Sequence, residues 1–351
     1  MRELFGELSA VRPDLELVSF VNREAGAGFW GELGRVVRLP LSPRSRPAWA
    51  WAELAAVPAA AARARVDVLH SPANFGPAAG PFARVLTVHD LLFRRHPELL
   101  SRAMRIGTEA LVPPAARRAH RVITVSHASR DDLVELLDIA AERIDVIPNA
   151  WTPPRSLPDP AAARRRLDAG ARPIGLSVAS DLPHKNLPLL LEALAVLEPA
   201  ERPLLVLAGH GTDSGTLPAR ARELGVEDDV RLLGGVGAER LEELYAAASA
   251  VVTVTRLEGF GLPVLEALGR GVPAVCSDLP VLREVAGDAA LWVDPDVPTS
   301  VAAGLRTALA GGPEIERLRA SGRDRALRFS WRAAAERTAG VYDRAAAARR
   351  G

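Results

Sequence analysis

The chain has 351 residues, enough for two domains, and its 48% apolar and 25% charged content describes a globular protein with an ample core. A formal net charge of +1 gives no reason to expect nucleic acid as a partner. The single cysteine, Cys276, excludes an intramolecular disulfide, and no apolar run reaches the ~20 residues that span a bilayer. We therefore expect a cytoplasmic protein.

The first half of the chain alternates apolar strands with helices. Helices are expected over residues 2–11, 49–65 and 97–119, and another begins at Ser126 or Ser129. Strands are expected over Glu16–Val21, Arg35–Leu39, Val66–His70, Arg84–His89, Val122–Val125 and Ile144–Ile147. Two of these strands end in histidine, at the edge where parallel sheets bind ligands. His70 is expected to be a structural histidine.

The second half repeats the alternation after a proline-rich segment, residues 151–160, that is typical of an interdomain linker. Strands are expected over Ile174–Ala179, Pro203–Ala208, Val230–Leu233, Val251–Val254, Val272–Cys276 and Leu291–Val293. Cys276 is therefore assigned to the core. Helices are expected from Leu187 and from Leu262, and the chain after Val297 is helical and rich in alanine and arginine, with a last helix from about Trp331.

Basic residues gather around the predicted helix over 97–119. They are Arg94, Arg95, Arg117, Arg118 and Arg121. A membrane-facing patch is one interpretation, but ordinary solvated arginine is favoured in a chain this rich in arginine.

The stretch from Ala250 to Val285 predicts a strand–loop–helix–strand unit. Its loop is Glu258-Gly259-Phe260-Gly261, and Leu262-Pro263 begins the helix that carries Glu266. Glycines allow a ligand close to the backbone, and the first N–H groups of a helix attract phosphate. Because carboxylates repel phosphate, the two glutamates are interpreted as acceptors for hydroxyl groups on either side of a diphosphate. The alternative is that both are ordinary surface charges.

Lys185 is the only lysine among 44 basic residues. It lies in the loop Ser180–Asn186, between a predicted strand and helix, at the same sheet edge as Glu258. Such an exception favours a site that needs a compact ammonium rather than a planar guanidinium.

The sequence E-G-F-G-L-P-x-x-E resembles the signature of glycosyltransferase family 4, the retaining, mannosyltransferase-like group 1 enzymes of the GT-B fold. The resemblance extends from about Asp67 to Trp331. It implies two Rossmann-like domains that face a cleft: an N-terminal acceptor domain (1–152), a C-terminal nucleotide-sugar donor domain (153–330), and a last helix (331–351) that packs back on the first domain.

The resemblance also implies roles for single residues. The histidine of T-V-H-D, His89, contacts the donor sugar near the reacting carbon, and Asp90 is mainly structural. Lys185 binds the donor's diphosphate. The expected catalytic residues are therefore His89, Lys185 and Glu258. Donor binding is assigned to Lys185, His184, Gly209, Gly259, Phe260, Gly261, Leu262 and Glu266.

The chain departs from the family at several positions. It begins at the first helix, whereas relatives begin with a strand and a glycine-rich turn, so the first strand of the N-terminal domain is apparently missing. Relatives pair the lysine with an arginine where this chain has His184 or Ala179, and His184 is the expected partial substitute. Asp294-Pro295-Asp296 matches a metal-binding D-x-D pattern, but we interpret it as a turn and helix cap and expect no metal.

The sequence thus predicts a retaining hexosyltransferase. Its partners would be a nucleoside-diphosphate sugar and a glycan or lipid-linked acceptor, with no nucleic acid, no metal and no cofactor. Peripheral contact with the inner membrane face is an open alternative location. The alternative functions are a nucleotide-sugar epimerase and a catalytically weak nucleotide-sugar-binding partner protein, whereas a dehydrogenase is disfavoured because no G-x-G-x-x-G follows an early strand.

Overall fold

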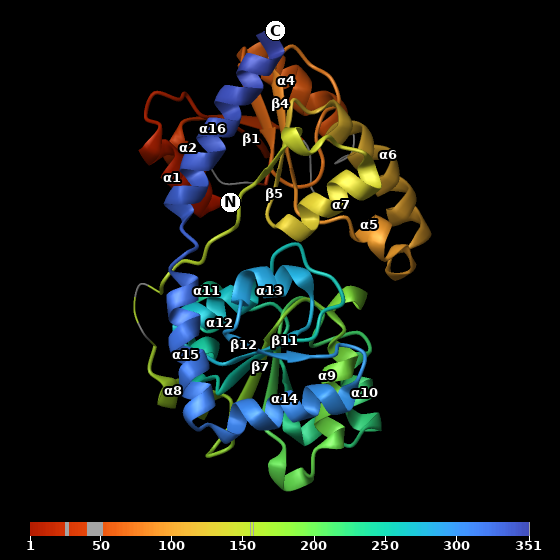
Figure 1. The fold of residues 1–351 in the computed structure, drawn as a ribbon, viewed down its shortest axis with the longest axis vertical. Coiled ribbons are helices and arrows are strands. Elements are labelled where there is room, and N and C mark those ends of the chain that lie inside the picture. Colours follow the sequence, from red (N-terminus) through yellow and green to blue (C-terminus); the bar gives the residue numbers. More distant parts are fainter. Residues whose placement is uncertain (25–27, 41–51, 155, 157, 351) are drawn as a thin grey trace. The chain divides into compact units, whose positions relative to one another are not determined.

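The computed structural model describes residues 1–24, 28–40, 52–154, 156 and 158–350. It separates into two compact units (Figure 1). Unit 1 contains Met1–Asn149 and Ser330–Gly351, and unit 2 contains Ala150–Phe329. The sequence-based boundaries, at 152/153 and 330/331, lie within three residues of these. No helix among the described residues is long and apolar enough to cross a membrane.

Unit 1 contains two sheets, and all of their strands are parallel. A two-stranded sheet pairs β1 (Val18–Asn22) with β2 (Arg35–Leu39). The larger sheet has the order β3-β4-β5-β6, with β3 Val68–Ser71, β4 Ala83–Val88, β5 Arg121–Thr124 and β6 Ile144–Val146. The alternation of strands and helices therefore produces the parallel arrangement that the sequence predicts.

The helices of unit 1 include the expected ones, two of them with corrections, and two short helices that were not expected, over Gly28–Leu33 and Leu92–Arg95. They are α1 (Arg2–Val11), α2 (Gly28–Leu33), α4 (Val57–Ala64), α5 (Leu92–Arg95), α6 (Arg102–Arg118), α7 (His127–Leu137) and α16 (Trp331–Arg350), with short turns at Ala52–Ala56, Pro97–Leu99 and Ala141–Arg143. The helix expected over 97–119 is interrupted, because Ser101 caps a new helix by accepting a hydrogen bond from the N–H of Met104. The helix expected over 49–65 begins with residues 49–51, which lie outside the described residues, and continues as a π-helical turn.

The last helix, α16, belongs to unit 1 and packs along α1 and β4 (Figure 1). Ala335 and Ala345 of this helix are fully buried, in the same hydrophobic cluster as Leu8 of α1 and Val85 of β4. Alanine lets a helix approach a sheet closely, so the alanine-rich end of the sequence forms core in unit 1.

Unit 2 contains one six-stranded parallel sheet in the order β12-β11-β10-β7-β8-β9. The strands are β7 (Ile174–Val178), β8 (Leu204–Ala208), β9 (Val230–Leu232), β10 (Ala250–Thr253), β11 (Ala274–Ser277) and β12 (Ala290–Val293). From the centre, the chain winds outward in one direction through β7, β8 and β9, and in the other through β10, β11 and β12. The strand order therefore reverses between β7 and β10, which pair directly.

Helices accompany the strands of unit 2 (Figure 1). They are α8 (Pro160–Arg166), α9 (Leu187–Val196), α10 (Leu217–Glu223), α11 (Ala238–Ala247), α12 (Leu262–Arg270), α13 (Pro280–Ala286), α14 (Pro298–Ala310) and α15 (Pro313–Ala326), with short turns at Pro183–Lys185, Pro199–Glu201 and Glu227–Asp229. The strand side chains are buried on both faces, as the apolar runs predict, and Cys276 is fully buried in β11. Burial raises the pKa of its thiol.

Candidate active site

Lys185 and Glu258 meet at the point where the strand order of unit 2 reverses. Lys185 follows β7 and Glu258 follows β10, and the lysine Nζ donates a hydrogen bond to Glu258 Oε1 at 2.5 Å. The two side chains are 21% and 11% exposed. In doubly wound sheets, ligands bind outside the carboxyl ends of the strands at such a reversal. The only lysine of the chain is therefore placed where this fold binds ligands, and it is paired with a carboxylate.

The loop that carries Lys185 is fixed by its neighbour, Asn186. Asn186 has a left-handed backbone (φ 57°), and its buried amide donates to the carbonyl oxygens of Val254 at 3.3 Å and Pro295 at 2.6 Å. The carbonyl oxygen of His184 accepts a hydrogen bond from the N–H of Arg256 at 2.8 Å. The loops after β7, β10 and β12 are thus tied together. No role was expected for Asn186, although a left-handed position is one that asparagine tolerates better than most residues.

The glycine loop leads into α12, which begins at Leu262 with Pro263 in its first turn. Gly261 has φ +94°, and a Cβ there would lie 2.4 Å from Leu282 Cδ2. Both facts restrict this position to glycine. The side chain of Phe260 is buried, and its ring packs edge-on against Phe329 with centroids 5.7 Å apart. The Phe260 side chain therefore belongs to the core, and the expected contact of this residue with the donor stays a prediction that only its backbone could meet.

Glu266 lies on α12 and accepts a hydrogen bond from the hydroxyl of Tyr245 at 2.7 Å. Arg270, one turn later, stacks on the Tyr245 ring with its guanidinium carbon 4.5 Å from the ring centroid. Burial raises the pKa of Glu266, and the Tyr245 hydrogen bond and the Arg270 charge act in the opposite direction. Glu266 and Glu258 thus have different surroundings, since one is bonded to a phenol and the other to an ammonium.

Gly209, in the loop after β8, contacts the loops after β7 and β9. A Cβ at this position would lie 2.0 Å from the carbonyl oxygen of Ala179, so only glycine lets the loop after β8 pass this close to the loop after β7. Its N–H donates to the carbonyl oxygen of Gly234, after β9, at 2.8 Å. Gly209 therefore shapes the sheet edge near Lys185 and His184, and its contact with a ligand stays a prediction.

The D-x-D sequence forms a turn, as expected. Asp294 Oδ1 accepts a hydrogen bond from the N–H of Asp296 at 2.9 Å, and Asp296 pairs with Arg256 at 2.9 Å. The expected helix cap is wrong, because Val297 is the N-terminal cap residue of α14 and no side chain caps it. Among the residues that the structure describes, no group of three or more histidine, cysteine or acidic side chains could hold a metal ion.

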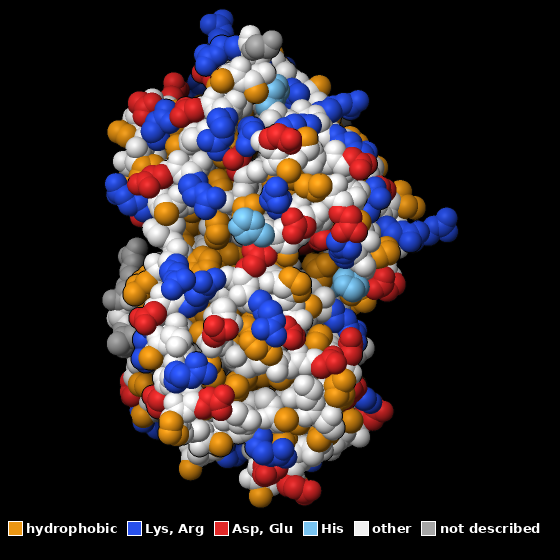
Figure 2. All heavy atoms as spheres, viewed as in Figure 1, with side chains coloured by type: hydrophobic (Ala, Val, Ile, Leu, Met, Phe, Trp, Pro, Cys, Tyr) orange, Lys and Arg blue, Asp and Glu red, His pale blue; other side chains and the backbone are white. Residues whose placement is uncertain are grey.

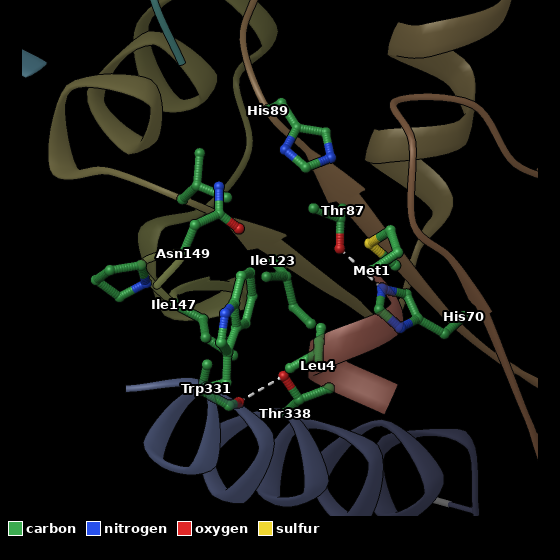
Figure 3. A pocket seen from close by; sticks show the side chains of 13 residues that line it. Met1, Leu4, His70, Thr87, His89, Ile123, Ile147, Asn149, Trp331 and Thr338 are labelled. Atoms are coloured by element: carbon green, nitrogen blue, oxygen red, sulfur yellow. Dashed lines mark hydrogen bonds between the residues drawn. The ribbon is translucent and has the colours of Figure 1, made fainter. Parts of the chain in front are cut away.

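In unit 1, His89 follows β4 and is held by hydrogen bonds. Its N–H donates to Asn74 Oδ1 at 2.7 Å, and its Nε2 lies 2.9 Å from the carbonyl oxygen of Pro72. Asp90 accepts a hydrogen bond from the N–H of Leu92 at 3.0 Å, which is a structural role. His89 lines a small pocket within unit 1 together with His70, Thr87, Asn149, Trp331 and others (Figure 3).

The basic residues around α6 are largely engaged with carboxylates. Arg94 pairs with Glu109, Arg95 with Asp132 at 2.6 Å, and Arg121 with Asp145 at 2.7 Å. Figure 2 shows lysine and arginine side chains interspersed with aspartate and glutamate on the face that it draws. These pairs fit the interpretation of solvated, mixed charge better than that of a dedicated membrane-facing patch.

A doubly wound parallel sheet with glycine-rich loops and a lone lysine at its reversal point defines an α/β protein of the nucleotide-binding class. Residues 161–325 match the family model of the glycosyl transferases group 1, and residues 12–153 match that of Glycosyltransferase Family 4. The chain is 32% identical over 264 residues to the O-antigen chain mannosyltransferase B of Escherichia coli, which covers 74% of this chain and 69% of that protein. The chain belongs to the group 1 glycosyltransferases.

Two further similarities agree with this assignment. The MMP alpha-(1->4)-mannosyltransferase of Mycolicibacterium hassiacum is 32% identical over 236 residues, 66% of this chain and 56% of that protein. The structure of Anabaena HepE in complex with UDP and glucose superposes with a TM-score of 0.73 at 20% identity, covering 97% of this chain and 95% of that one. The fold is the two-domain GT-B architecture of glycosyltransferases, and the protein is a glycosyltransferase.

Proposed function

We propose that the protein transfers a hexose from a nucleoside-diphosphate sugar to an acceptor hydroxyl with retention of configuration. The observation that carries the proposal is the convergence of Lys185, Glu258 and the N-terminal end of α12 at the strand-order reversal of unit 2. An ammonium and the N-terminal end of a helix favour a diphosphate, and a nearby carboxylate favours sugar hydroxyls. Unit 2 would then hold the donor and unit 1 the acceptor.

The reaction breaks the bond between the sugar's C1 and the phosphate oxygen and forms a bond from C1 to the acceptor oxygen. Negative charge develops on the leaving diphosphate, where Lys185 and the start of α12 stabilise it. The leaving phosphate takes the acceptor's proton, so no protein nucleophile and no metal ion is required. In this proposal Glu258 places the sugar and Glu266 holds the ribose, and His89 keeps its expected role as a contact of the donor sugar.

A glycan or a lipid-linked glycan is the proposed acceptor class. The support is the similarity to an O-antigen chain mannosyltransferase, which also favours mannose as the sugar and polysaccharide biosynthesis as the setting. We place the protein in the cytoplasm, where nucleotide-sugars are made, with peripheral contact to the inner membrane face through the acceptor rather than through a dedicated arginine patch.

The test is a screen of donors with product analysis. GDP-mannose, UDP-glucose and UDP-N-acetylglucosamine are each incubated with the protein, with and without methyl α-D-mannopyranoside as the acceptor probe. Release of nucleoside diphosphate together with a new α-linked disaccharide supports the proposal. Conversion of the donor into its epimer without diphosphate release supports the epimerase instead. Tight donor binding without any turnover supports the binding-partner alternative.

A further inference from the structure

A chain of hydrogen bonds crosses unit 1 from its last helix to the pocket beside His89. The hydroxyl of Tyr342, on α16, lies 2.7 Å from His70 Nδ1, and His70 Nε2 lies 2.8 Å from Thr87 Oγ1. Tyr342 and Thr87 are 8% and 6% exposed. Among the described residues, these are the only hydrogen bonds that the Tyr342 hydroxyl and the His70 ring make. We call these three residues the Tyr342–His70–Thr87 chain.

The donor and acceptor roles in this chain depend on the tautomer of His70, and burial of the Tyr342 phenol favours one of the two. A buried phenol must donate its proton, and His70 Nδ1 is the acceptor within reach, so Nδ1 carries no proton of its own. Neutral imidazole has one N–H, which must then be on Nε2 and donates to Thr87 Oγ1. Burial lowers the pKa of His70 to about 3, with a smaller contribution from the nearby His89, so the ring stays neutral at working pH.

The hydroxyl of Thr87 is the end of this chain. Its oxygen accepts from His70, so its own proton must be donated to some other group. Thr87 lines the pocket, and Figure 3 shows it with His89, Asn149 and Trp331 around the same space. The cavity measures about 30 Å³, which is enough for one water molecule or one hydroxyl group.

We infer that Thr87 donates a hydrogen bond to an oxygen of the acceptor and that Tyr342 and His70 are positioning residues which fix this direction. The inference rests on the proposed function, in which unit 1 binds the acceptor. The pocket suits a single hydroxyl group of a sugar acceptor: Trp331 and Ile147 supply apolar walls, and Thr87, His89 and Asn149 supply polar groups. The last helix thereby sets the direction of a hydrogen bond inside the pocket through Tyr342.

The first measurement determines the tautomer of His70. Full-length protein labelled with ¹⁵N-histidine is studied by long-range ¹H–¹⁵N NMR between pH 6 and 8, and Tyr342→Phe assigns the His70 signals among the seven histidines. A neutral ring protonated on Nε2 throughout this range is expected. A ring protonated on Nδ1 overturns the inference, because Thr87 would then donate to His70 and not into the pocket.

The second measurement separates a positioning role from a structural one. Thr87→Val removes the hydroxyl at nearly constant shape, and Thr87→Ser keeps it. With GDP-mannose as donor and methyl α-D-mannopyranoside as acceptor probe, Thr87→Val should lower kcat/KM for the acceptor about tenfold, the effect of one lost hydrogen bond. The donor KM and the rate of donor hydrolysis by water should change less than twofold, and Thr87→Ser should restore most of the loss.

Tyr342→Phe should lower kcat/KM for the acceptor in the same selective way, although Tyr342 contacts His70 on the opposite side from Thr87. Equal losses in acceptor transfer and donor hydrolysis, or no loss with Thr87→Val, would overturn the inference while leaving the proposed function in place. Wild-type protein without turnover of any donor in the screen would instead overturn the proposed function, and with it the acceptor role of Thr87.

Discussion

The ion pair between Lys185 and Glu258 leads to a prediction with an unusual sign. In the structure the lysine that is proposed to bind the diphosphate already donates to a carboxylate at 2.5 Å. A diphosphate must therefore compete with Glu258 for the ammonium. Glu258→Gln removes the competing charge and keeps the size of the side chain. We predict that this variant binds nucleoside diphosphates more tightly than the wild type, although its turnover falls because the sugar is no longer placed.

The magnitude follows from the geometry of the pair. Two unit charges about 4 Å apart at a permittivity of about 20 attract by about 4 kcal/mol. Water reaches both partly exposed side chains, and the desolvation that pairing requires offsets part of the attraction. A net competition of about 1–2 kcal/mol remains, which corresponds to a five- to thirtyfold increase in affinity when Glu258 loses its charge.

The assay is calorimetric titration of GDP and UDP into the wild type, Glu258→Gln and a matched control, Glu266→Gln. The control changes a second glutamate of the same segment that is bonded to Tyr245 and not to Lys185, so it should show no gain in affinity. Adding Lys185→Ala to Glu258→Gln should abolish the gain. Equal or weaker diphosphate binding by a folded Glu258→Gln protein would show that the pair does not compete with the ligand.

Four further predictions test other parts of the site. Lys185→Ala should weaken diphosphate binding at least tenfold, measured by calorimetry. Lys185→Arg should keep only part of the wild-type affinity, because a planar guanidinium replaces a compact ammonium. Full affinity in the arginine variant would contradict this prediction. Transfer activity should survive EDTA, because Lys185 and the start of α12 are assigned the role of a metal, and loss that Mn²⁺ or Mg²⁺ restores would refute the assignment. Gly261→Ala should cost about 1–3 kcal/mol in urea unfolding, given its φ of +94° and the 2.4 Å approach of the new Cβ to Leu282. The control Gly107→Ala lies in α6 with no heavy atom within 4 Å of the new Cβ, so it should instead stabilise the protein, by up to about 1 kcal/mol. Burial raises the pKa of Glu266 in the folded state. The unfolding free energy of the wild type should therefore fall relative to that of Glu266→Gln as pH rises through this pKa. A difference between the two proteins that does not grow between pH 4.5 and 7.5 would contradict this prediction.

The sheet of unit 2 could be predicted from local signals because its strands are buried on both faces. A strand such as β10 appears in the sequence as a short apolar, β-branched run between turn residues, and its observed bounds agree within a residue. The start of α12 was equally local, since Gly261 and Pro263 each fix a backbone angle. The order of the strands was not visible in the sequence, because order depends on which edges pair after the helices have crossed over.

The partners of the site residues could not be predicted, since they come from distant parts of the chain. Lys185 and Glu258 are 73 residues apart, and His70 and Tyr342 are 272 apart. A motif places a side chain at a sheet edge but does not say which group it meets there. Phe260 shows the same limit, because its place in the glycine loop did not indicate that its ring packs against Phe329.

The position of the only lysine, at the strand-order reversal of unit 2, has a physical explanation in the proposed chemistry. Every basic residue of this chain except Lys185 is an arginine. Several of these arginines pair with carboxylates at the surface, such as Arg283 with Asp278 and Arg306 with Glu201. At the reversal, Asn186 binds the loop after β7 to the loops after β10 and β12, so the backbone around Lys185 is fixed before any ligand arrives. A flexible lysine on a fixed loop can move from a carboxylate to a diphosphate by rotation of its side chain alone. An arginine that makes two parallel bonds to Glu258 would lose both at once in the same exchange, which gives a physical reason for the only lysine to stand at this position.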